Sequence, residues 1–259
     1  MTNAHGDFIW YELWTSDPDA AAGFYGGVLG WQATPVEGSA IGYRLLGPGQ
    51  AAVAGLMEVP RDAAAAGASP RWLGYVGVDD VDRAAAAVLR EGGAQHVPPT
   101  DIPGIGRFAL LADPQGILFY LMRGAGEAAS TAFAPDRPGH CHWNELSTPD
   151  PAAALAFYGG LFGWAPGDAM PMGELGEYRF LVQSGRTIGA MMPRLPQGAA
   201  SWRFYFGVAD IDAAAAAVAG HGGAVLHGPA EVPGGLFVIQ ARDPQGAAFG
   251  LVGQRRPGG

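Results

Sequence analysis

The 259-residue chain contains no lysine, and all 15 of its basic residues are arginines. This absence excludes a Schiff-base nucleophile, a pyridoxal-phosphate anchor and the lysine of a phosphate-binding loop. Cys141 is the single cysteine, so an intrachain disulfide and a multi-thiolate metal site are excluded as well.

Charge and long apolar runs are also scarce. Only 15% of the residues are charged, and 24 acidic against 15 basic groups give a formal net charge of −9. A chain without a basic run lacks the electrostatic signature of a protein that binds nucleic acid or an anionic membrane. No apolar stretch approaches the roughly 20 residues of a membrane span, and no signal-peptide pattern opens the chain. We expect a cytoplasmic globular protein.

What the chain does contain is an internal duplication. Trp10-Tyr-Glu-Leu-Trp-Thr-Ser-Asp17-Pro recurs as Trp143-Asn-Glu-Leu-Ser-Thr-Pro-Asp150-Pro, and Asp113-Pro-Gln-Gly116 returns unchanged as Asp243-Pro-Gln-Gly246. Seven such blocks match in one order, which predicts two tandem domains, residues 1–123 and 139–259. Residues 124–138, rich in Ala, Gly, Ser and Pro, are predicted to form the linker.

Each half divides again into two modules of the order strand, helix and three strands. The first module begins with a predicted strand, Phe8 to Thr15, followed by Asp17-Pro18 and a helix that Gly30 ends. An Asp N-cap followed by Pro at the first helical position favours a helix start there. In the second module Asp80 is predicted to cap a helix from Val81 to Arg90. The sequence therefore predicts an α+β protein of four βαβββ modules.

These modules, with their "Asp-Pro, helix, Phe-Tyr, Gly-Trp" and "Asp-Pro-x-Gly, strand" blocks, resemble the vicinal oxygen chelate superfamily. That superfamily includes glyoxalase I, extradiol dioxygenases and bleomycin-binding proteins. The resemblance covers roughly Phe8 to Val252 and is strongest to two-domain actinobacterial members. It implies open, U-shaped mixed sheets with the helices outside and a ligand or metal on the concave face.

The resemblance also implies a divalent cation held by His or Glu at one position on each of four strands. The residues at the positions that can be matched are Trp10, Trp143, Leu73, Arg203, Tyr120 and Gly250. These side chains do not form a divalent-cation site, so we expect neither a metal nor another cofactor. His140 and His142 are an alternative pair of ligands, but strand alternation places His142 opposite to Trp143.

The same alternation predicts which side chains face the cavity. In the first module these are Trp10, Glu12 and Trp14, and in the third they are Trp143, Glu145 and Ser147. The second and fourth modules add Tyr75, Tyr120, Arg203 and Tyr205 as ligand-binding candidates. Trp31, Trp72, Trp164 and Trp202 are predicted to be core residues instead.

Glu12 and Glu145 are the candidate catalytic residues. A carboxylate among Trp and Tyr side chains is desolvated, which suits acid–base chemistry. A buried ion pair with Arg44 or Arg179, which the duplication also repeats, is an equally good interpretation. A third interpretation is a hydrogen bond from a phenol or amine of a ligand.

Two functional hypotheses follow. The first is a metal-independent pocket protein that binds a hydrophobic aromatic natural product or metabolite, as in resistance by sequestration. The second is a secondary-metabolism enzyme, a hydroxylase, lyase or isomerase that uses a buried Glu. The missing ligands disfavour a metal-dependent glyoxalase or dioxygenase. Because no nucleophile–base pair or cofactor motif is visible, the sequence favours binding. The expected partner is a small aromatic or polycyclic ligand, on a monomer with paired internal domains or on a homodimer.

Overall fold

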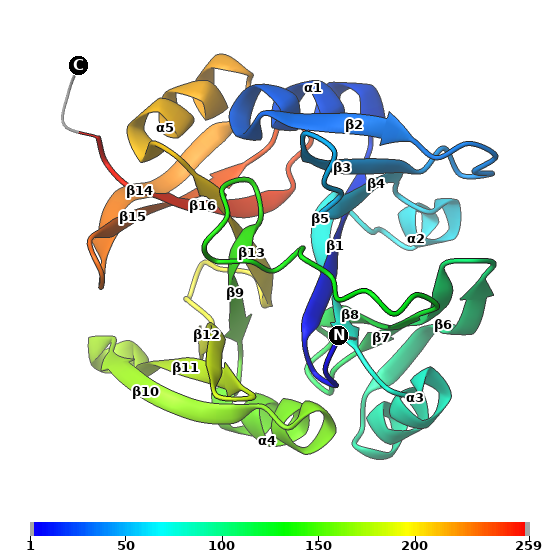
Figure 1. The fold of residues 1–259 in the computed structure, drawn as a ribbon. Helices are drawn as coiled ribbons and strands as arrows, with labels where there is room; N and C mark the ends of the chain where they lie inside the picture. Colours follow the sequence, from blue (N-terminus) through cyan, green and yellow to red (C-terminus); the bar gives the residue numbers. More distant parts are fainter. Residues whose placement is uncertain (1–2, 257–259) are drawn as a thin grey trace. The chain divides into compact units, whose positions relative to one another are not determined.

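The computed structural model describes residues 3–256 and contains the four predicted βαβββ modules (Figure 1). The first module comprises β1 (Phe8–Thr15), α1 (Pro18–Leu29), β2 (Trp31–Pro35), β3 (Arg44–Pro48) and β4 (Ala54–Glu58), followed by α2 (Arg61–Ala65). The second comprises β5 (Arg71–Gly77), α3 (Val81–Arg90), β6 (Ala94–Ile102), β7 (Gly106–Ala112) and β8 (Leu118–Gly124).

The second half repeats this order. The third module comprises β9 (Cys141–Thr148), α4 (Pro151–Phe162), β10 (Ala165–Pro171), the 3-10 helix η1 (Gly173–Leu175), β11 (Glu177–Gln183) and β12 (Arg186–Pro193). The fourth comprises β13 (Ser201–Val208), α5 (Ile211–Gly220), β14 (Ala224–Val232), β15 (Leu236–Arg242) and β16 (Ala248–Gly253). The strands form two eight-stranded mixed sheets, β2-β3-β4-β1-β5-β8-β7-β6 and β10-β11-β12-β9-β13-β16-β15-β14. The predicted α+β class is confirmed.

The helix signals in the sequence act as predicted. The Asp17 side chain accepts a hydrogen bond from the Ala20 amide, and Pro18 is the first residue of α1. The helix ends where Gly30 adopts a left-handed conformation, φ 68°, which a residue with a Cβ adopts only at a steric penalty. Asp80 likewise caps α3 over the predicted residues.

Strand β6 extends from Ala94 to Ile102, although it contains Pro98 and Pro99. Proline removes a backbone donor and is tolerated at a sheet edge or a bulge. β6 is the last strand of its sheet, and its pairing with β7 shifts register between Val97 and Thr100.

Close packing groups the described chain into two compact units, each of which takes a module from each half. One, which we call the end-module unit, holds the first and fourth modules in residues 10–72, 131–142 and 203–256. The other, the middle-module unit, holds the second and third modules in residues 3–9, 73–130 and 143–202. Residues 124–138, predicted as a linker, include the buried Ala132 and Phe133.

The core of the end-module unit is a group of aromatic rings beneath α1 and α5, which lie beside each other in Figure 1. Tyr11 packs against Phe204 with 4.9 Å between ring centroids, and Trp31 packs against Phe206 at 5.0 Å. The Trp72 indole N–H donates to the Tyr25 hydroxyl at 2.8 Å. The prediction that Trp31 and Trp72 are core residues is confirmed.

A buried hydrogen bond joins the two modules of this unit. The Tyr25 hydroxyl donates to Asp243 Oδ2 at 3.1 Å, while Asp243 Oδ1 accepts from the amides of Gln245 and Ala247. The carboxylate therefore organises the Asp-Pro-Gln-Gly turn of the fourth module and holds the helix of the first.

The middle-module unit repeats this arrangement. The Tyr158 hydroxyl in α4 donates to Asp113 Oδ2 at 3.0 Å, and Asp113 Oδ1 accepts from the amides of Gln115 and Ile117. The Tyr158 ring stacks on Trp164 at 5.3 Å and meets Trp202 edge-on at 5.7 Å. Trp164 and Trp202 are thus core residues, as predicted.

Among the described residues, no helix is both long enough and apolar enough to cross a membrane.

We expect Tyr25→Phe to lower the free energy of unfolding by about 2 kcal/mol. The substitution removes the donor to the buried Asp243 carboxylate and the acceptor of the Trp72 N–H. Chemical denaturation measures the effect, and Asp243→Asn with the double variant completes a thermodynamic cycle. Additive losses in the double variant would contradict a direct Tyr25–Asp243 interaction.

The same carboxylate predicts a pH dependence. Burial raises the pKa of Asp243 above its ordinary value, against the opposing effect of its hydrogen bonds. A carboxyl with a raised folded-state pKa binds protons on folding, so its contribution to stability is lost as the pH rises through that pKa. Between about pH 4 and pH 7 the wild type should therefore lose stability relative to Asp243→Asn. A difference that stays constant across this range would refute the prediction.

Candidate functional site

Glu12, on β1, is the centre of a hydrogen-bonded cluster in the end-module unit. Its side chain is 2% exposed, and its two oxygens accept from Trp14 Nε1 at 2.9 Å and from the Tyr43 hydroxyl at 3.1 Å. The Tyr43 oxygen in turn accepts from Trp10 Nε1 at 3.1 Å. The donors run in one direction, from the Trp10 indole through Tyr43 to the carboxylate.

Glu145, on β9, has the same arrangement in the middle-module unit. The residue is 5% exposed, and its Oε2 accepts from the Tyr178 hydroxyl at 3.0 Å. Trp143 Nε1 donates to the Tyr178 oxygen at 2.8 Å, and the Trp143 ring meets Phe180 edge-on at 5.7 Å. Both halves thus keep a Trp–Tyr–Glu chain, as the duplication repeats it.

Tyr43, in the Trp10–Tyr43–Glu12 hydrogen-bond chain, is held in its neutral form. Burial raises the pKa of the Tyr43 hydroxyl well above its ordinary value, and the negative charge of Glu12 raises it further. Tyr43 therefore keeps its proton and donates it to Glu12 in a hydrogen bond. It fixes the Trp10 ring and the carboxylate relative to each other.

The ion pairs considered for the two glutamates are not present, which corrects that interpretation. Arg44 Nη2 pairs with Asp19 at 2.7 Å, and Arg179 pairs with Glu177 and donates to the Gly167 carbonyl. Strand register gives the reason. Arg44 lies opposite Leu56, which lies opposite the fully buried Leu13, whereas Glu12 is on the alternate face of β1.

Tyr43 and Tyr178 are the residues that sequence reasoning missed. Each immediately precedes one of these arginines in a repeated Tyr-Arg pair, so the signal was present. The Tyr43 phenol occupies space over Gly55, which is the Cα partner of Glu12. A Cβ at Gly55 would lie 1.8 Å from the Tyr43 oxygen, so the missing side chain makes room for the hydroxyl.

The second-module candidates lie together in the middle-module unit. Tyr75 and Tyr120 occupy paired positions on β5 and β8, and their rings stack at 4.1 Å with 11° between planes. They are 6% and 4% exposed. The third-module candidate Ser147 is half-buried on β9, opposite Met192.

The fourth-module candidates differ from their counterparts. Tyr205 pairs with Gly250, and its ring covers the glycine so closely that a Cβ there would lie 2.2 Å from the ring. Gln240 Nε2 donates to the Tyr205 hydroxyl at 3.0 Å. Arg203 is half-buried on β13. Where the second module stacks two phenols, the fourth has one phenol over a glycine.

The superfamily's divalent cation does not fit the residues present. Within residues 3–256 no three His, Cys, Asp or Glu side chains are grouped so as to hold a metal ion. Trp10 and Trp143, at the first-strand positions, supply N–H donors to tyrosines and offer no lone pair to a cation.

The His140–His142 pair serves a different purpose. His140 Nδ1 lies 2.6 Å from the Thr131 carbonyl, and His142 Nε2 lies 2.8 Å from the Arg137 carbonyl. Burial lowers the pKa of His142, which keeps its ring neutral at pH 7. Both rings hold the segment that precedes β9.

The fold and the repeated modules define a class of protein, and comparison with known proteins agrees. The family described as Glyoxalase/Bleomycin resistance protein/Dioxygenase superfamily matches residues 8–121 and 137–251. The chain belongs to this superfamily, as the resemblance predicted.

Two groups of relatives align along nearly the whole chain. It is 35% identical over 247 residues to "Putative glyoxylase CFP32" of Mycobacterium tuberculosis, covering 94% of this chain and 93% of the relative. It is 31% identical over 268 residues to "Anthracycline biosynthesis protein DnrV" of Streptomyces peucetius, covering 96% and 94%.

Among solved structures, the chain is similar to the Mn(II)-bound glyoxalase from Novosphingobium aromaticivorans. The TM-score is 0.68 at 19% identity, over 98% of this chain and 84% of that one. It is also similar to the 2,3-dioxygenase LapB from Pseudomonas sp. KL28, with a TM-score of 0.65 at 15% identity, over 98% and 94%. These similarities support the fold.

We expect Tyr43→Phe to lower the free energy of unfolding by about 2 kcal/mol, because Glu12 loses a donor and Trp10 an acceptor. Denaturation followed by far-ultraviolet circular dichroism measures it. Gly55→Ala is the matched variant: its Cβ moves the Tyr43 hydroxyl while leaving every partner group in place. If both variants unfolded like the wild type, the Trp10–Tyr43–Glu12 hydrogen bonds would make no contribution to stability.

Proposed function

We propose that this protein binds a hydrophobic, hydroxylated aromatic metabolite at the Trp–Tyr–Glu chains, without a metal. The observation that carries the proposal is the repeated chain itself, Trp10–Tyr43–Glu12 and Trp143–Tyr178–Glu145. It combines an aromatic face and a carboxylate acceptor, the two features that a phenolic ligand requires.

Pre-organisation supports binding. Trp10 and Trp143 are half-buried, so part of each indole is accessible, and the N–H bond to tyrosine fixes the ring orientation. A ring that is already oriented loses little conformational entropy when a planar ligand stacks on it. The carboxylate accepts hydrogen bonds and favours a ligand that carries a hydroxyl donor.

The relatives support the same ligand class. One of the two groups carries a name from anthracycline biosynthesis, and anthracyclines are planar hydroxylated polycycles. Sequestration as a form of resistance is the role that a metal-free binding site in this superfamily suits best.

A dihydroxyanthraquinone is a suitable probe, with unsubstituted anthraquinone as its comparison. We expect saturable quenching of tryptophan fluorescence by the hydroxylated compound. Trp10→Ala or Trp143→Ala should weaken binding at its own chain about tenfold, from the lost stacking surface. Glu12→Gln and Glu145→Gln should reduce the preference for the hydroxylated compound over the unsubstituted one.

The variants also separate the two chains. A loss in only one tryptophan variant assigns binding to that half, whereas losses in both assign it to both. If the double variant Trp10→Ala/Trp143→Ala binds the probe as tightly as the wild type, the proposed site is wrong.

The second candidate function is an enzyme of secondary metabolism that uses Glu12 or Glu145 as its acid–base group. The burial of both carboxylates among Trp and Tyr side chains favours it. Mass spectrometry of the probe after incubation distinguishes the two functions. Binding returns the probe unchanged, whereas catalysis yields a product whose formation Glu12→Gln or Glu145→Gln abolishes.

A further inference from the structure

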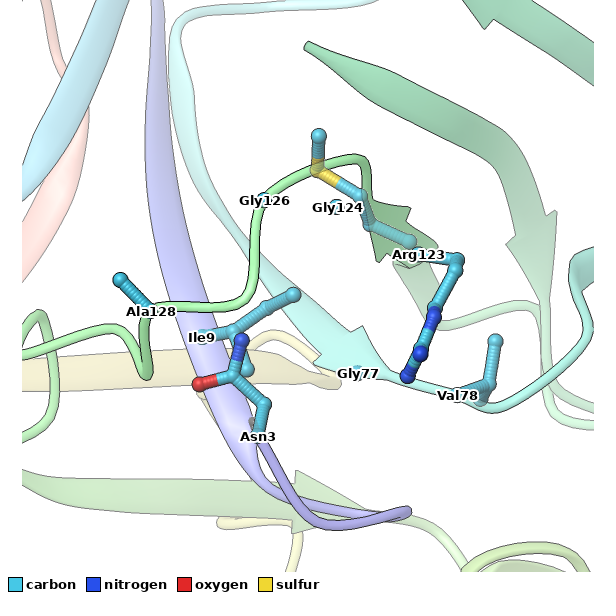
Figure 2. Close-up of a pocket in the computed structure, with 9 residues that line it drawn as sticks. Asn3, Ile9, Gly77, Val78, Arg123, Gly124, Gly126 and Ala128 are labelled. Carbon is cyan, nitrogen blue, oxygen red and sulfur yellow. The ribbon is translucent and has the colours of Figure 1, made fainter. Parts of the chain in front are cut away.

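A small pocket in the middle-module unit is lined by residues that do not belong to the Trp–Tyr–Glu chains. Its volume is about 100 Å³. The lining residues are Asn3, Ile9, Gly77, Val78, Met122, Arg123, Gly124, Gly126 and Ala128 (Figure 2). A water molecule occupies about 30 Å³ of liquid, so the pocket suits a group of a few heavy atoms and excludes a polycycle.

Two donor groups border this pocket. Figure 2 shows the Arg123 side chain descending from β8 toward Gly77 and Val78. Asn3 Oδ1 accepts a hydrogen bond from the Ser130 amide at 2.7 Å, which fixes the carboxamide and leaves its NH₂ branch as the donor. A guanidinium and an amide NH₂ both donate, and neither can accept.

Among the acidic residues next to the lining in sequence, Asp79 pairs with His5 at 3.8 Å, and the exposed Glu127 lies between the lining residues Gly126 and Ala128. Arg107, the cross-strand partner of Arg123, pairs with Asp82 and Asp101. Asp7 pairs with Arg186 and accepts from the Ala4 amide. Over residues 3–256, Arg123 itself has no ion-pair partner.

The remaining walls are apolar and lack bulk. Ile9 is buried beside Gly77, where an added Cβ would come within 2.9 Å of the Ile9 side chain. Glycine at position 77 therefore keeps the floor open. An apolar wall opposite two donors is complementary to a carboxylate with a short carbon tail.

We propose that this pocket binds the carboxylate of a small organic acid of two or three carbons. Arg123 supplies the positive charge, the Asn3 amide a second hydrogen bond, and Ile9 and Met122 the surface for the tail. This site is independent of the aromatic ligand and accepts a different chemical class.

Acetate is the probe, and acetamide, of the same shape but uncharged, is its control. The glycines of the pocket supply the readout through their amide resonances in ¹H–¹⁵N correlation spectra at constant ionic strength. We expect acetate, but not acetamide, to shift the signals of Gly77, Gly124 and Gly126 in a saturable way.

Arg123→Gln should weaken acetate binding about tenfold or more, because a charge-assisted hydrogen bond is lost. Arg90→Gln, at an exposed arginine of α3 in the same unit, is the matched control and should leave the affinity unchanged. Both side chains are exposed, so both variants should fold. Equal shifts from acetate and acetamide, a linear response without saturation, or unchanged binding by Arg123→Gln would each overturn the proposal.

Discussion

Tyr25 and Tyr158 each carry a buried hydroxyl that donates to an aspartate of another module. In the end-module unit the acceptor is Asp243, and in the middle-module unit it is Asp113. Each aspartate uses its other oxygen to hold two backbone amides of its own turn. One carboxylate thus fixes a turn and a distant helix at once. The hydrophobic burial of these rings is non-directional, whereas this hydrogen bond fixes the position of each helix relative to the turn.

A hydrogen-bond chain from a tryptophan through a tyrosine to a carboxylate occurs both in the core and at the candidate site, with a different outcome. Trp72 donates to Tyr25, which donates to Asp243, and Trp10 donates to Tyr43, which donates to Glu12. In the core the indole is buried and the chain stabilises packing. At the candidate site the first indole is half-buried, and the hydrogen-bond chain fixes its orientation.

The two halves have diverged at positions that affect these groups. Gly55 faces Glu12, whereas Ala190 faces Glu145. Tyr120 is replaced by Gly250 at the matching position. Such differences give two copies of one fold unequal side chains at matching positions.

Local signals in the sequence determined the modules. Asp-Pro starts and Gly ends placed the helices, alternation placed Trp10, Glu12 and Trp14 on one face of the first strand, and the repeats defined the four-module order. These features depend on neighbours in the chain, and the superfamily followed from their combination.

Only the tertiary structure decided which groups meet. The repeated Tyr-Arg pair offered each glutamate two partners, and the register of β1, β4 and β3 directed Arg44 toward Asp19 and Tyr43 toward Glu12. The pairing of the first module with the fourth, and of the second with the third, likewise depends on Tyr–Asp contacts across long stretches of chain. Sequence patterns specify which face a side chain takes on its own strand. Register and packing between distant strands determine what that face meets.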